Sequence, residues 1–219
     1  MRVLILGASG MVGRGVLREC LRADDVTDVV SVGRSPLQFA DRKLRSVVVA
    51  DLFSFDVDPE NLSDVDACFF CLGVSSTGVS AETYERITHD LTLAVADALA
   101  AHSPDPTFIY VSGAGTSETG RMRWARVKGR TERELVARFP KAYMFRPGII
   151  QPLHGVRSRT RLYRVLYTAA TPLVAVLRRV TPRLIVTTEE VGKAMLAVAR
   201  HGAPTKYLEN ADIAALARS

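Results

Sequence analysis

The segment over residues 2–23 constrains the fold of this chain more than any other. It begins with an apolar run of strand-forming residues, passes through three glycines spaced three residues apart, and continues with the amphipathic pattern of a helix. A strand that turns through such a glycine-rich loop into a helix is the phosphate-binding unit of a Rossmann fold. The sequence therefore predicts a protein that binds NADP or NAD.

The three glycines of this loop have separate tasks. Gly7 permits the tight turn that leaves the strand, Gly10 lets the backbone approach a pyrophosphate, and Gly13 lets the helix pack closely on the sheet. The helix N-terminus then offers unpaired N–H groups and the positive end of its dipole to phosphate oxygens. The cofactor-binding residues expected from this unit are Gly7, Ala8, Ser9, Gly10, Met11, Val12, Gly13 and Arg14.

The end of the second expected strand distinguishes the two cofactors. NAD-specific sites place an acidic residue there, which accepts hydrogen bonds from the adenosine ribose. This chain has Arg34 at that position, and a guanidinium suits a bidentate grip on a 2′-phosphate. Arg14, at the start of the first helix, is expected to join it. The sequence therefore favours NADP, with NAD as the alternative.

The remainder of the chain alternates short β-rich apolar runs with helical stretches. This alternation predicts an α/β fold, a doubly wound parallel Rossmann sheet with helices on both faces. Strands are expected at 2–6, 28–32, 46–50, 67–72, 107–111 and 142–146, and helices at 11–23, 81–102 and 123–139. Residues 1–147 are predicted to form the dinucleotide-binding core. Residues 148–219 are predicted to form a small substrate cap and a C-terminal helix that packs on the core, all within one structural domain.

Composition and charge limit the classes of partner that this chain is expected to bind. The net charge of +6 leaves a nucleic acid or a membrane surface open, but most basic faces are solvated, so neither is expected. The run 162–180 is interrupted by arginine, threonine and proline and predicts no transmembrane span. A basic amphipathic helix over 157–180 is expected to pack on the core rather than on a membrane surface. Without a signal peptide ahead of the first strand, we expect a cytoplasmic protein with a small-molecule substrate and with a homodimer left open.

Cys68 and Cys71 form a CxxC pattern that invites a metal or redox interpretation. They lie in the apolar run that is expected to be the fourth strand. Residues three apart on a strand point to opposite faces, so one metal ion or one disulfide does not easily take both. We predict that they are small buried hydrophobic residues.

Further motifs follow the later strands, namely Ala50-Asp51-Leu52, Cys71-Leu72-Gly73, Ile109-Tyr110-Val111-Ser112 and Phe145-Arg146-Pro147-Gly148. With the glycine loop, they make the chain similar to the short-chain dehydrogenase/reductase superfamily, in its extended and atypical branches. The resemblance covers nearly the whole chain. It is nearest to the small NADP-binding oxidoreductases similar to the Tat-interacting protein, which are related to NAD-dependent epimerase/dehydratases. It implies further cofactor contacts at Asp51, Leu52, Cys71, Leu72, Gly73, Val111, Lys128, Pro147 and Gly148.

The chemistry of that family rests on a Tyr-x-x-x-Lys motif, in which the lysine ammonium lowers the pKa of the tyrosine phenol. The matching stretch here keeps the lysine as Lys128 but has Trp124 in place of the tyrosine. An indole N–H only donates and does not titrate in the useful range, so Trp124 is expected to stack on the substrate or nicotinamide, or to cap the pocket. Lys128 is expected to bind the nicotinamide ribose.

The resemblance implies a catalytic set of Ser112, Trp124 and Lys128, where Ser112 is the hydroxyl at the end of the fifth strand. Tyr84 and His154 are outside candidates for a replacement acid.

Two functions follow. The first is an NADP(H)-binding oxidoreductase or epimerase-like enzyme for a small carbonyl or sugar-like substrate. The second is a catalytically weak or inactive NADP(H)-binding sensor or regulatory protein.

Overall fold

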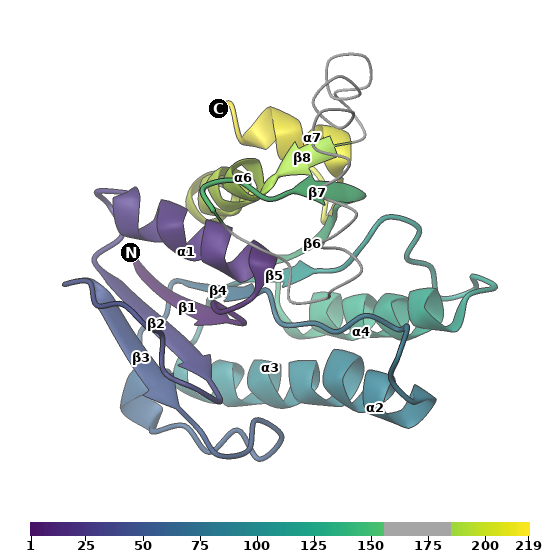
Figure 1. The fold of residues 1–219 in the computed structure, drawn as a ribbon, viewed down its shortest axis with the longest axis horizontal. Coiled ribbons are helices and arrows are strands. Elements are labelled where there is room, and N and C mark those ends of the chain that lie inside the picture. Colours follow the sequence, from purple (N-terminus) through teal and green to yellow (C-terminus); the bar gives the residue numbers. More distant parts are fainter. Residues whose placement is uncertain (156–184) are drawn as a thin grey trace.

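The structure, a computed structural model, describes residues 1–155 and 185–219 (Figure 1). Seven strands form one sheet in the order β3-β2-β1-β4-β5-β6-β9, and every neighbouring pair is parallel. The strands of this sheet are β1 (Arg2–Leu6), β2 (Asp28–Gly33), β3 (Leu44–Val48), β4 (Ala67–Phe70), β5 (Thr107–Val111), β6 (Ala142–Arg146) and β9 (Tyr207–Glu209). The doubly wound Rossmann fold expected from the sequence is confirmed.

Helices cover both faces of this sheet (Figure 1). One face carries α1 (Met11–Arg22), α6 (Thr188–His201) and α7 (Asn210–Leu216). The other carries α3 (Leu91–His102) and α4 (Arg123–Arg138), with α2 (Ala81–Glu85) and a π-helical turn, Arg86–Asp90, leading into α3. A short 3₁₀ turn, Pro59–Asn61, precedes β4, and a separate parallel pair joins β7 (Ile149–Gln151) to β8 (Ile185–Thr187).

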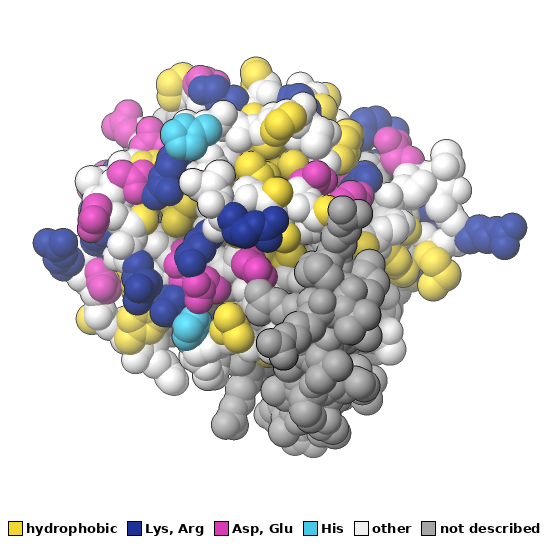
Figure 2. All heavy atoms as spheres, turned by 90° about the horizontal axis from the view of Figure 1, so that it is seen from above, with side chains coloured by type: hydrophobic (Ala, Val, Ile, Leu, Met, Phe, Trp, Pro, Cys, Tyr) yellow, Lys and Arg dark blue, Asp and Glu magenta, His cyan; other side chains and the backbone are white. Residues whose placement is uncertain are grey.

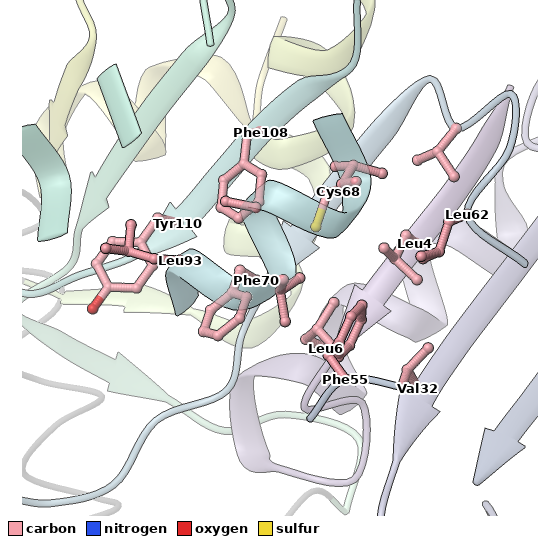
Figure 3. Close-up of a cluster of buried hydrophobic side chains, with 14 of the residues drawn as sticks. Leu4, Leu6, Val32, Phe55, Leu62, Cys68, Phe70, Leu93, Phe108 and Tyr110 are labelled. Atoms are coloured by element: carbon pink, nitrogen blue, oxygen red, sulfur yellow. The ribbon is translucent and has the colours of Figure 1, made fainter. Parts of the chain in front are cut away.

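Side chains of the central strands alternate between two hydrophobic cores. Leu4, Cys68 and Phe108 point to the face of α3 and α4, where Figure 3 shows them packed together. Their chain neighbours, such as Ile5 and Phe69, point to the face of α1 and α6. Strands that are buried on both faces must be apolar at nearly every position. This requirement is the reason that the continuous apolar runs of the sequence located the central strands correctly.

The expected and observed elements differ mainly at edges and ends. The third strand is expected over 46–50 but covers Leu44–Val48, because at the edge of the sheet only alternate residues need burial. The fourth ends at Phe70 rather than residue 72, since Cys71 and Leu72 turn over the end of β1. The short strands β7, β8 and β9 and the helix α7 are absent from the sequence prediction, because three-residue strands carry too little pattern to recognise.

The C-terminal part of the chain contributes to the body of the fold. β9 extends the sheet beside β6, and α6 packs on α1. The candidate membrane-surface segment 157–180 and the rest of the predicted cap over 156–184 lie outside the described residues. In the described ranges, no helix is long and apolar enough to cross a membrane.

Charges of both signs are interspersed on the face that carries α1, α6 and α7 (Figure 2). Ion pairs there join Arg200 to Asp25 at 2.5 Å and Lys193 to Glu189 at 2.6 Å. Each basic group of these pairs has an acidic neighbour, so this face does not carry a field of one sign. The net charge of +6 is therefore not concentrated on it.

The helices α1 and α6 approach each other through glycines. A Cβ on Gly15 of α1 would lie 2.6 Å from both the Cβ and the carbonyl oxygen of Thr188, and a Cβ on Gly192 of α6 would lie 2.8 Å from Cγ of Glu19. The start of α6 is fixed by a capping box, in which the Thr187 hydroxyl accepts from the Glu190 N–H at 3.0 Å. The close crossing leaves no room for a side chain at either glycine.

We therefore expect Gly15→Val to destabilise the protein by about 1–3 kcal/mol, the range for overpacking a tight core. The measurement is chemical denaturation followed by circular dichroism. Gly33→Ala is the matched control, because a Cβ there would meet its nearest atom at 3.8 Å, an ordinary contact. Equal stability of Gly15→Val and wild type would contradict the crossing described here.

Candidate functional site

The candidate site lies where the order of the strands reverses. Successive strands run outward from β1 in one direction as β2 and β3 and in the other as β4, β5 and β6. At such a switch point the loops after the two central strands diverge and leave a crevice at their carboxyl ends, where doubly wound proteins bind ligands. The glycine loop after β1 and the segment Cys71–Gly73 after β4 meet at this point.

Gly7 fixes the contact between these two segments. Its φ of +82° lies in the left-handed region, and a Cβ there would be 2.7 Å from the backbone nitrogen of Leu72. Cys71 donates its N–H to the carbonyl of Leu6 at 2.9 Å. A Cβ on Gly73, by contrast, would meet nothing within 4 Å. The predicted residues Cys71 and Leu72 are thus brought against the glycine loop, and Gly73 follows them in open space.

The loop and the first turn of α1 form a cradle of backbone groups. A Cβ on Gly13 would overlap the carbonyl oxygen of Gly7, and the Gly10 N–H donates to that same oxygen at 2.9 Å. In the described part of the chain no side chain caps α1, and its first turn has no acidic residue. The N–H groups of a first turn have no partner within their own helix, so they are available to an anion. Ala8 is buried, whereas Ser9, Met11 and Val12 are partly exposed.

This cradle fits the pyrophosphate of a dinucleotide. It combines backbone donors, the positive end of a helix dipole and the absence of side chains at the two closest approaches. Arg14 and Arg34 are both exposed at the rim of this half of the site, Arg14 in α1 and Arg34 directly after β2. The structure records no ion pair for either arginine among the residues it describes.

Asp51 and Leu52 follow β3 and differ in environment. The Asp51 side chain is exposed, and one of its oxygens accepts the N–H of Phe53 at 2.9 Å, which closes a local turn. The Leu52 side chain is buried in the core beneath α3. Any contact of Leu52 with a cofactor would therefore involve its backbone rather than its side chain.

The other half of the site is assembled after β5 and β6. The Ser112 hydroxyl lies 3.0 Å from the Thr116 hydroxyl, which donates to the Gly113 carbonyl at 2.8 Å. Because a hydroxyl has one proton, this arrangement makes Ser112 the donor to Thr116 and leaves the lone pairs of Ser112 free to accept. Ala114 donates its N–H to the Pro147 carbonyl at 3.0 Å, which ties the loop after β5 to the turn after β6.

The turn after β6 has a second tie. Gly148 donates its N–H to the Asn210 side-chain oxygen at 2.8 Å, and Asn210 is the first residue of α7. Thr116 and Asn210 are residues that the sequence reasoning missed. Thr116 is a hydroxyl four residues after Ser112, and that spacing was a usable signal. Asn210 gave none, because 62 residues separate it from its partner.

Lys128 reaches this half of the site from α4. Its Nζ donates to the Ser112 carbonyl at 3.0 Å and to the Val111 carbonyl at 3.3 Å, both at the carboxyl end of β5. The same nitrogen lies 5.3 Å from the centre of the Tyr110 ring. Burial lowers the pKa of Lys128 to about 8, and the charge of Glu132 opposes this effect. Lys128 therefore brings an ammonium group of reduced pKa to the end of β5.

Trp124 lies one helical turn before Lys128 and is partly exposed. Its indole lies against Gly115, since a Cβ on Gly115 would be 3.7 Å from Cη2 of the ring. Gly115 has a φ of +82° and turns the loop after β5 back toward α4. The structure thus brings Ser112, Trp124 and Lys128 together around the loop after β5.

The two outside candidates for a replacement acid have other environments. Tyr84 is 4% exposed, and burial raises the pKa of its phenol, which makes it a weaker acid. One ring nitrogen of His154 lies 2.7 Å from Glu189, whose other oxygen binds Lys193. His154 therefore belongs to an ion-pair group at the start of α6, and Tyr84 to the buried layer around Tyr110.

Cys68 and Cys71 lie in the two different cores, as the strand geometry predicted. Burial raises the pKa of Cys20, Cys68 and Cys71. All three are free thiols, and the described residues contain no cluster of three or more His, Cys, Asp or Glu that suits a metal ion. They act as packed apolar groups.

Residues 7–144 match the model of the NAD(P)H-binding protein family. Among curated relatives, Protein FMP52, mitochondrial, of Saccharomyces cerevisiae is 30% identical over 164 residues, covering 74% of this chain and 69% of the relative. Protein HTATIP2 of Rattus norvegicus is 29% identical over 151 residues, covering 68% and 62%. The matches thus span about two thirds of the length of these relatives.

Solved structures share the fold at low sequence identity. The UDP-glucuronic acid 4-epimerase from Bacillus cereus in complex with NAD has a TM-score of 0.69 at 12% identity, over 95% of this chain and 76% of that one. The PhqB reductase domain from Penicillium fellutanum has a TM-score of 0.67 at 18% identity, over 95% and 66%. These structures show the fold alone; the expected dinucleotide-binding fold and the expected similarity to a Tat-interacting protein are confirmed.

We expect the thiols of the folded protein to resist modification. A thiol whose pKa is raised by burial holds little reactive thiolate at pH 8. Native protein should therefore react slowly with Ellman's reagent, and denatured protein should release the full count of three thiols. A thiol that reacts within seconds in the native state would contradict this environment.

Proposed function

This chain belongs to the NAD(P)H-binding family, and from that premise we propose that it is an NADP(H)-dependent oxidoreductase or epimerase-like enzyme for a small carbonyl or sugar-like substrate. One observation carries the proposal. The cradle at Gly7 and Gly13, which has no side chains, lies at the switch point between β1 and β4. Lys128 lies at the carboxyl end of β5, the neighbour of β4. This arrangement offers one site for a pyrophosphate and another for the reacting end of the cofactor.

NADP is the proposed cofactor because of the exposed cations on the adenosine side. Arg34 follows β2 directly, at the position where an acidic residue would favour NAD. Arg14 stands on the exposed side of the first turn of α1. A 2′-phosphate would gain charge-assisted hydrogen bonds from one or both.

The residues of β5, α4 and β6 are proposed to hold the reacting end. When bound, the cofactor supplies or accepts a hydride. Lys128 binds the nicotinamide ribose, Ser112 accepts a hydrogen bond from a hydroxyl of the substrate, and Trp124 covers the pocket with its ring. The segments Cys71–Gly73, Val111 and Pro147–Gly148 border the cofactor with backbone groups.

The alternative function is a sensor or regulatory protein that binds NADP(H) with little or no turnover. Trp124 supports this alternative, because it occupies the place of a titratable phenol and has no proton to exchange near neutral pH. Losing one general acid typically removes about 10²–10⁴ in rate. NADPH would then change the association of the protein with a partner rather than be oxidised.

Location, assembly and the substrate cap are part of the same proposal. We keep the cytoplasm as the location, while the fungal relatives are named as mitochondrial proteins, and fractionation of cells distinguishes the two compartments. Gel filtration with light scattering distinguishes a monomer from a homodimer. The residues that bind the dinucleotide are proposed to end near residue 147, with substrate selection in the segment that follows, while β9 and α6 complete the core.

For the cofactor, we expect Arg34→Ala to weaken NADPH binding about 10–100-fold, since hydrogen bonds to a charged group contribute about 1.5–3 kcal/mol. Binding of NADH should stay unchanged, because NADH has no 2′-phosphate. The measurement is calorimetric titration of both cofactors. Arg218→Ala, an exposed arginine near the C-terminus, is the control and should bind both as wild type does. An equal loss for NADPH and NADH would contradict the role of Arg34.

For turnover, we expect wild-type protein to oxidise NADPH with members of a panel of small aldehydes, ketones and quinones. We expect Trp124→Tyr to be slower, because the loop at Gly115 is packed against an indole and a phenol would leave part of that space empty. The measurement is the loss of absorbance of NADPH. Wild-type protein that binds NADPH but oxidises none across the panel would exclude the enzyme and leave the sensor.

A further inference from the structure

A half-buried ion pair joins α4, the helix that carries Trp124 and Lys128, to the end of β6. Glu132 on α4 is 1% exposed, and both of its carboxylate oxygens are held by Arg146, the last residue of β6. Nε of Arg146 donates to Oε1 at 3.0 Å, and a second guanidinium nitrogen donates to Oε2. This bidentate geometry satisfies a carboxylate that burial would otherwise destabilise.

Glu132 is also the charge nearest to Lys128 on its own helix. The two residues are four apart on α4, so their side chains lie on one face. Glu132 raises the pKa of Lys128, whereas burial lowers it by more. Because the guanidinium of Arg146 already neutralises Glu132, the carboxylate stabilises the ammonium only weakly.

Among residues 1–155 and 185–219, the other elements around Lys128 provide no competing charge. From β5 it meets the Tyr110 ring and the carbonyls of Val111 and Ser112. Burial raises the pKa of Tyr110 and of Tyr84, the phenol of α2 that faces Tyr110, so both stay neutral. The far side of Arg146 contacts the Tyr207 ring at 4.6 Å and Glu209 at 3.5 Å.

We propose that Lys128 is the proton donor of this site in place of the missing tyrosine, and that Arg146, by holding Glu132, is the positioning residue that keeps Lys128 able to release its proton. The inference rests on the proposed function. Two of the three ammonium protons are used on the carbonyls of Ser112 and Val111. The third is the one transferred to the substrate oxygen, and this contact replaces the ribose contact proposed above for Lys128. The indole N–H of Trp124, one turn earlier, donates hydrogen bonds but does not ionise near neutral pH, so it cannot supply this proton.

The step balances in atoms and charge. The carbonyl carbon receives a hydride from the reduced nicotinamide, and the electron pair of its double bond moves to the oxygen. That oxygen takes a proton from Nζ of Lys128, so one N–H bond breaks and its electron pair stays on a neutral amine. A proton from water restores the ammonium. In the reverse direction the neutral amine accepts the proton of the alcohol.

The direction in which each substitution shifts the pKa of Lys128 follows from the charge that it removes. Glu132→Gln removes the negative charge, so the ammonium loses support and the pKa of Lys128 falls. Arg146→Gln leaves Glu132 uncompensated, so the pKa of Lys128 rises. If the pair had only a structural role, the two substitutions would not shift the pKa of Lys128 in opposite directions. Arg133→Gln removes a charge from the exposed side of the same helix, beside Glu118, and should leave Lys128 unchanged.

The titration is measured by NMR on ligand-free protein that carries ¹³C-labelled lysine. The chain has five lysines, and the signal lost in Lys128→Arg assigns Lys128. We expect a wild-type midpoint near pH 8, an upward shift in Arg146→Gln and a downward shift in Glu132→Gln. If Arg146→Gln does not fold, the double variant Arg146→Met/Glu132→Met replaces the pair by apolar groups and should shift the midpoint downward. Midpoints that do not move overturn the role of Arg146.

Turnover tests the donor itself. Lys128→Arg keeps the charge and the hydrogen-bond donors but cannot release a proton near neutral pH. We expect it to bind NADPH within tenfold of wild type and to lose about 10²–10⁴ in kcat. A wild-type rate in Lys128→Arg overturns the donor role. If the NMR shifts appear as expected but wild-type protein oxidises no NADPH, the proposed function fails instead.

Discussion

The close approach of two backbone segments at the switch point is the constraint on which the rest of the structure depends. Gly7 leaves β1 with a left-handed φ and passes within contact of Leu72 after β4, and Gly13 brings α1 down onto the same turn. Side chains at these positions would collide with backbone atoms, which cannot move aside. The glycines therefore set the start of α1 and the direction of its dipole.

Long-range polar contacts assemble the other half of the site. Lys128 of α4 donates to the end of β5, Ala114 joins the loop after β5 to the turn after β6, and Asn210 holds that turn from α7. Each contact satisfies a buried or half-buried backbone group, so losing one would leave a polar group unpaired. The geometry of Ser112, Trp124 and Lys128 thus depends on residues that come from separate parts of the chain.

Charge in this half is balanced without the tyrosine that the family pattern contains. The carboxylate of Glu132 is shared between a guanidinium and an ammonium, and the guanidinium has the closer, bidentate contact. The buried lysine therefore holds its proton less firmly than a lysine in water. That balance distinguishes this site from one in which a lysine serves only to activate a phenol.

The sequence by itself determined the Rossmann fold, the glycine loop and the central strands, because these depend on local patterns: continuous apolar runs and glycines at fixed spacing. It also placed Cys68 and Cys71 on opposite faces through the strand period. Only the tertiary structure decided that Leu52 is buried, that Thr116 shares the proton of Ser112, and that Glu132, Arg146 and Asn210 support the site. Those contacts join residues far apart in the chain, and a pairing across such separations leaves no periodic signal to read.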